Sequence, residues 1–150
     1  MRLTWIGAVL ALGALACGEK KTDQAAAGQP AAQAAAEPTG PVVEVQMTGG
    51  GTVFKFEPAA LTVPAGATVR FINLSGGPHN VAFFPDSIPA GAADKLNATM
   101  ANRMDNLSGP FLINANDHYD ISFAGLPAGS YKGFCTPHQA LGMKFTLTVK

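Results

Sequence analysis

The sequence predicts an all-β domain, folded as a β-sandwich or barrel, over about residues 41–150. The first observation behind this prediction is that apolar and polar residues alternate in several short runs, a pattern typical of strands with one buried face. The second is that Gly and Pro clusters separate these runs. Closely spaced turns of this kind favour a sandwich or barrel over a helical bundle.

Each alternating run is expected to form one strand. The four clearest runs are residues 42–47, 67–73, 118–123 and 143–150. The turn clusters between them are residues 49–51, 64–66, 75–78 and 127–129. Residues 92–107 do not alternate, which predicts one short helical or irregular insertion.

Composition excludes several classes of protein. The 10 basic residues balance the 10 acidic ones, so the chain lacks the positive charge with which a protein grips a phosphate backbone, and no nucleic-acid partner is expected. With 47% hydrophobic and 13% charged residues, it is not wholly disordered. Two cysteines exclude a disulfide-dense scaffold, and three histidines are too few for a centre of several metal ions.

Residues 1–16 are predicted to be a signal peptide. Arg2 is followed by an apolar run that is shorter than the ~20 residues of a transmembrane helix. The run ends Ala-Leu-Ala before Cys17, which resembles the lipobox of bacterial lipoproteins, although Ala14 stands where those proteins usually have leucine. The alternative is an ordinary signal peptide with an incidental cysteine. Either reading predicts a periplasmic or other extracytoplasmic protein, anchored to a membrane only if Cys17 is lipidated.

Residues 17–40 are predicted to be a disordered tether rich in Ala, Gln and Pro. Without aromatic or β-branched apolar residues, the segment cannot bury enough surface to offset the entropy of ordering it. The alternative is a short helix around residues 31–37, which would be marginal in isolation. Residues 41–150 then form the folded domain.

Three residues near the C-terminus and one histidine upstream carry the chemistry. Cys135, His138 and Met143 have the spacing Cys-x2-His-x4-Met, and His79 stands at an expected strand start. Singly, each has an ordinary reading: a small buried cysteine, a core methionine, a turn histidine. Together they match a Cys/His₂ copper site with a weak axial thioether. Zinc is the rival metal, but a thioether is an unusual fourth ligand for it.

The sequence resembles the small blue-copper proteins (cupredoxins), and among them the plastocyanin/pseudoazurin group. The resemblance rests on CTPHQALGM at 135–143, GGPHNV at 76–81 and IPAGA at 88–92, and it spans about residues 41–150. It implies an antiparallel Greek-key β-sandwich and a single type 1 copper ion. By matching position, His79, Cys135 and His138 would be the equatorial ligands and Met143 the axial one.

The resemblance also suggests which residues surround the copper ligands. Asn80 would join the two ligand loops, with its side chain bonded near Thr136; alternatively it is only a turn-favouring residue. Pro137 has no N–H and so cannot donate a hydrogen bond to the Cys135 sulfur.

In the family, the C-terminal histidine ligand, here His138, reaches the surface through an apolar patch where electrons leave. The candidate patch residues are Phe54, Pro78, Pro137, Ala140 and Leu141. The alternative for Ala140 and Leu141 is ordinary loop exposure. Phe134 replaces the Tyr that plant plastocyanins carry beside the copper Cys, and no acidic cluster is present. A partner docked by strong charge steering is therefore not expected.

Two functions remain open at this point. One is a monomeric one-electron carrier that makes transient contact with a redox protein, such as a cytochrome, oxidase or reductase. The other is a copper-binding lipoprotein that stores, delivers or buffers copper. A copper enzyme would need further histidine-rich sites, so catalysis is not expected. His118 fits no ligand spacing and is predicted to be exposed to solvent.

Overall fold

The computed structural model describes Pro38 and residues 40–150. The predicted signal peptide, Cys17 and all but two residues of the predicted tether lie outside the described residues. In the described part of the chain, no helix has both the length and the apolar character needed to cross a membrane.

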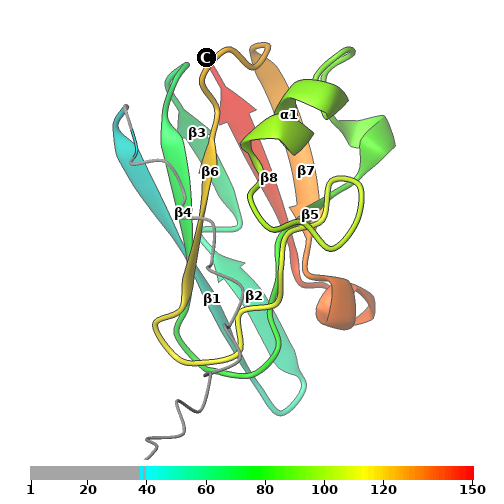
Figure 1. The fold of residues 1–150 in the computed structure, drawn as a ribbon. Coiled ribbons are helices and arrows are strands. Elements are labelled where there is room, and N and C mark those ends of the chain that lie inside the picture. The colour runs from blue at the N-terminus through cyan, green and yellow to red at the C-terminus, as the bar shows by residue number, and fades with distance from the viewer. Residues whose placement is uncertain (1–37, 39) are drawn as a thin grey trace, which may run out of the picture. The chain divides into compact units, whose positions relative to one another are not determined.

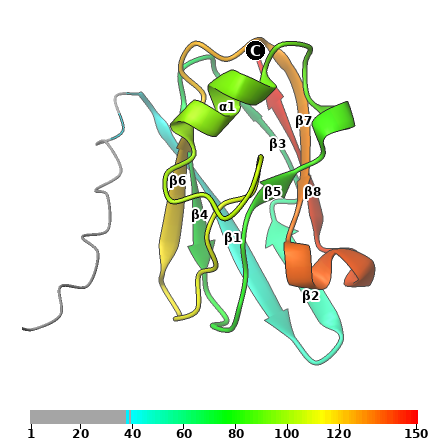
Figure 2. The same cartoon turned by 45° about the vertical axis from the view of Figure 1, so that its right-hand side comes forward.

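Two four-stranded sheets pack face to face, as Figures 1 and 2 show. The first sheet has the order β2-β1-β4-β6, formed by β1 (Val42–Gly50), β2 (Val53–Glu57), β4 (Thr68–Asn73) and β6 (His118–Ser122). The second has the order β3-β8-β7-β5, formed by β3 (Ala60–Val63), β5 (Ala82–Phe83), β7 (Gly129–Phe134) and β8 (Lys144–Val149). The predicted β-sandwich is confirmed, and all four alternating runs are strands.

The strand directions differ in part from the antiparallel arrangement that the resemblance implied. Four neighbouring pairs are antiparallel, but β1–β4 and β3–β8 are parallel, so both sheets are mixed. Parallel neighbours need a long connection, and here β2 and β3 lie between β1 and β4 in the chain. Alternation shows which face of a strand is buried and carries no information about the direction of its neighbour.

Aromatic side chains from both sheets meet in the core. Phe145 of β8 lies 4.8 Å from Phe56 of β2 and 5.3 Å from Phe71 of β4, measured between ring centroids. All three are almost fully buried. Gly133 of β7 lies under the edge of this cluster, where a Cβ atom would come too close to both the Phe145 ring and the Ala82 carbonyl oxygen. The aromatic packing therefore requires glycine at position 133.

The predicted insertion at 92–107 contains one short helix, α1 (Ala93–Thr99), followed by irregular chain. Its buried residue Leu96 joins the core. A 3₁₀ turn, η1 (Pro85–Ser87), precedes it. Another 3₁₀ helix, η2 (Thr136–Leu141), connects β7 to β8. In Figures 1 and 2, α1 and η2 lie at opposite ends of the sandwich.

Candidate metal centre

Two connections meet at the η2 end of the sandwich. Cys135 directly follows β7, His138 lies in η2, and Met143 directly precedes β8. His79 lies in the connection from β4 to β5, three residues before β5 rather than at its start. An isolated bridge to Leu112 holds it there, with hydrogen bonds of 3.1 and 2.7 Å between the two backbones.

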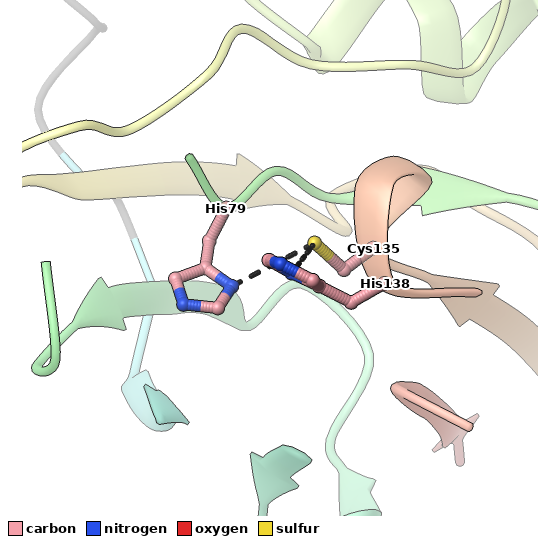
Figure 3. Close-up of side chains that lie close together, drawn as sticks. All are labelled: His79, Cys135 and His138. Carbon is pink, nitrogen blue, oxygen red and sulfur yellow. Dashed lines mark hydrogen bonds between the residues drawn. The ribbon is translucent and has the colours of Figure 1, made fainter. Parts of the chain in front are cut away.

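Three donor atoms converge between these connections (Figure 3). The Cys135 sulfur lies 3.7 Å from Nδ1 of His79 and 3.4 Å from Nδ1 of His138, and all three atoms lie within 4.8 Å of one another. A metal bound ~2.3 Å from sulfur and ~2.0 Å from nitrogen, at a tetrahedral angle, separates those donors by about 3.5 Å. The observed separations therefore fit donors to a single metal ion.

Met143 belongs to the same short loop. The Cys135 N–H donates to the Met143 carbonyl at 3.1 Å, and the Met143 N–H donates to the His138 carbonyl at 3.2 Å. Gly142, in the left-handed region at φ 84°, ends η2 and turns the chain into β8. The Met143 side chain is fully buried. The backbone thus joins the thioether residue to both other ligands of the loop.

Asn80 links the two connections. Its Oδ1 accepts the Thr136 N–H at 2.7 Å, and its Nδ2 donates to the Thr136 Oγ1 at 3.0 Å. Nδ2 also lies 3.2 Å from the Ser108 hydroxyl, and the whole residue is buried. The expected bond between Asn80 and Thr136 is present, and it fixes the loop that carries His79 against the loop that carries Cys135.

Comparison with known proteins assigns the family. Residues 43–150 match the family described as copper binding proteins, plastocyanin/azurin family. The chain belongs to this family. It is 38% identical over 108 residues to a plastocyanin of Scenedesmus fuscus, covering 72% of this chain and 99% of that one.

Other plastocyanins are also similar to this chain. A chloroplastic plastocyanin of Physcomitrium patens is 38% identical over 105 residues, but the chain spans only 56% of that protein's length. The oxidised plastocyanin of Dryopteris crassirhizoma superposes with a TM-score of 0.55 at 32% identity, over 72% of this chain and 100% of that one. The chemistry of the donors agrees with this assignment: a thiolate, two imidazoles and a thioether form a type 1 copper site.

Burial controls the protonation of the donors in this family member. Burial raises the pKa of the Cys135 thiol, and hydrogen bonds from the backbone N–H groups of Asn80 and His138 act in the opposite direction. Burial also lowers the pKa of His79, assisted by the nearby His138, and lowers that of His138 itself. Both imidazoles are therefore held in the neutral form that binds a metal.

The candidate patch residues are largely exposed. Pro137, Ala140 and Leu141 are exposed and belong to η2, the element that carries His138. Pro78 is exposed beside the buried His79, and Phe54 is half-buried. His118 is exposed on β6, as predicted, and is not part of the donor group.

Sequence reasoning missed two contacts at this centre. The Phe54 ring is stacked on His138, whereas the sequence predicted Phe54 only as a residue of the apolar patch. Ser75 Oγ lies 3.1 Å from Nε2 of His79. Ser75 stands in a run that reads simply as a turn, Ser-Gly-Gly-Pro, so no local signal could have singled it out.

Proposed function

We propose that this chain is an extracytoplasmic one-electron carrier that holds a single copper ion between His79, Cys135, His138 and Met143. The observation that carries the proposal is the convergence of the Cys135 sulfur and two imidazole nitrogens on one buried point. Copper bound there supplies a one-electron Cu(I)/Cu(II) couple.

The residues around the site support electron transfer because they limit rearrangement. Thiolate and thioether suit the reduced ion, and imidazole suits both oxidation states. The hydrogen bonds of Asn80 and the backbone bonds that close the Cys135–Met143 loop hold the donor residues in place. Little of the chain would then have to move when the charge of the site changes.

His138 is the proposed exit for the electron. Of the four donor residues, it alone is not fully buried. The exposed apolar residues Pro137, Ala140 and Leu141 surround it within η2, and the segment 134–143 contains no charged side chain. We propose that a redox protein, such as a cytochrome, oxidase or reductase, makes brief apolar contact with this surface, with the carrier acting as a monomer.

The proposed location outside the cytoplasm rests on residues 1–16 alone, which have the charge and length of a signal peptide. Lipidation of Cys17 is proposed on the same basis. Mass spectrometry of the mature protein isolated from membranes tests both, because lipidation leaves a modified Cys17 as the first residue. An unmodified N-terminus at or beyond position 17 would contradict the lipid anchor but would still agree with export through a cleaved signal peptide.

The first experiment records the absorption and EPR spectra of the Cu(II)-loaded full chain, Cys135→Ser and Cys17→Ser. We expect an intense blue thiolate-to-copper band with narrow hyperfine splitting in the wild type. Cys135→Ser should lose this band, and Cys17→Ser, which removes the other thiol, should keep it. A reversible one-electron wave in voltammetry would then support the carrier.

The contrary outcome is a pale, tetragonal copper spectrum that Cys135→Ser leaves unchanged. Cys135 would then not be a ligand, and storage or delivery of copper would become the better account. Burial of three of the four donor residues argues against that account, because a delivery protein needs a metal that exchanges readily.

A further inference from the structure

We propose that Ser75 is a positioning residue that holds His79 in the Nε2–H tautomer, so that its Nδ1 lone pair faces the metal centre. The metal role of His79 rests on the function proposed above. The hydrogen bond between Ser75 and His79 does not, since it joins two groups of the protein.

The two nitrogens of the His79 ring have different neighbours. Nδ1 faces the Cys135 sulfur at 3.7 Å, and Nε2 lies 3.1 Å from the Ser75 hydroxyl oxygen. Figure 3 shows one ring nitrogen turned toward Cys135 and the other turned away from it. The ring is almost fully buried, so its protonation pattern depends on these protein contacts.

The hydroxyl proton of Ser75 decides the direction of the bond. Ser75 Oγ donates this single proton to the Gly76 carbonyl oxygen at 3.3 Å. The lone pairs of Oγ are then free to accept, and the partner within reach is the Nε2–H of His79. With the proton on Nε2, Nδ1 carries the lone pair and can bind a metal.

Asn73 holds Ser75 in position. Its buried side chain accepts the Gly76 N–H at 3.1 Å and donates to the carbonyls of Gly77 and Leu112, each at 3.0 Å. Leu112 is also the bridge partner of His79. The turn that carries Ser75 and the backbone of His79 are therefore joined to the same segment, and these hydrogen bonds set the distance between the two residues.

The bond should also change the chemistry of a bound copper ion. An acceptor on Nε2–H makes Nδ1 a stronger donor, which stabilises Cu(II) more than Cu(I). Ser75→Ala should therefore raise the reduction potential and weaken Cu(II) binding roughly tenfold or more. Ser75→Thr, which keeps the hydroxyl, should restore both properties.

The test uses metal-free full chain, so it does not depend on the copper function. Two-bond ¹H–¹⁵N correlation spectra of the histidine rings at pH 8 report which nitrogen carries the proton. We expect His79 to be in the Nε2–H form in wild type and Ser75→Thr, and to show a mixture of tautomers in Ser75→Ala. Ser130→Ala, the same change at an exposed position of β7, should match the wild type.

Two outcomes would overturn the proposal: a wild-type His79 protonated on Nδ1, or a Ser75→Ala spectrum identical to that of the wild type. The first outcome is measured on the wild type, so the proposal can be overturned even if Ser75→Ala fails to fold. A missing blue band in the wild type would contradict the proposed function while leaving the tautomer result to stand by itself.

Discussion

The phenyl ring of Phe54 lies stacked on the imidazole of His138, with centroids 3.8 Å apart and ring planes 6° from parallel. Phe54 belongs to β2 in the first sheet, whereas His138 belongs to the loop between two strands of the second sheet. The β1–β2 hairpin therefore covers one face of the only donor residue that is not fully buried.

Removing this cover should lower the reduction potential. Phe54→Ala exposes the His138 ring to water, and water stabilises the oxidised site more strongly because that site carries the higher charge. Voltammetry of the copper-loaded protein measures the shift, with Val53→Ala as the control, since Val53 is an exposed neighbour on the same strand. A potential that is unchanged in Phe54→Ala, or raised, would show that the stack does not screen the metal.

Asn80→Ala should destabilise the protein even without metal. It leaves the Thr136 N–H without its partner and removes the bonds to the Thr136 and Ser108 hydroxyls. A hydrogen bond contributes about 0.5–1.5 kcal/mol, so losing these three part-buried bonds should lower the free energy of unfolding of the apoprotein in urea by about 1–3 kcal/mol. Copper affinity should fall about 10- to 100-fold as well.

The matched control for Asn80→Ala is Gln46→Ala, which deletes an exposed amide on β1 and should change the free energy of unfolding by less than about 0.5 kcal/mol. Equal effects of the two substitutions would mean that Asn80 does not join the ligand loops.

Some of this centre could be predicted from the sequence and some could not. Cys135, His138 and Met143 lie within nine consecutive residues, so their spacing alone constrains how they can meet at one point. The Ser75–His79 bond is local in the chain, but it lies in a turn whose composition gives no sign of it. The Phe54–His138 stack joins two segments that are far apart in the sequence. Such a long-range contact depends on which strands become neighbours, and alternation does not contain that information. The parallel pairs β1–β4 and β3–β8 were missed for the same reason.

The stability contributed by Asp117 should depend on pH. The backbone N–H of Asn114 lowers the pKa of this carboxyl below its ordinary value of about 3.9, with help from the N–H of Ile113 and the Asn114 side chain. The contribution is therefore fully present above that value, and it is lost as pH falls through the lower pKa of the folded state.

Asp117→Asn should accordingly be less stable than the wild type at pH 7, and the difference in free energy of unfolding should shrink below about pH 3.9. Urea unfolding of both metal-free proteins at pH 7, 5, 3 and 2 measures it. A difference that stays constant or grows toward low pH would mean that the carboxylate form is not the stabilising one.

Pro137→Ala should raise the reduction potential. The Cys135 sulfur already receives hydrogen bonds from the backbone N–H groups of Asn80 and His138, whereas Pro137 has no N–H to add. Alanine supplies a further donor in the same turn, and a hydrogen bond to the thiolate withdraws electron density from it, which destabilises Cu(II) relative to Cu(I).

Because Pro137 is exposed at the start of η2, we expect the loop to keep its shape, and the matched control is Leu141→Ala at the other end of η2. A reduction potential that rises in Pro137→Ala and not in Leu141→Ala would show that the absence of an N–H at position 137 lowers the potential of the copper site. An unchanged or lower potential would mean that the new N–H does not reach the sulfur.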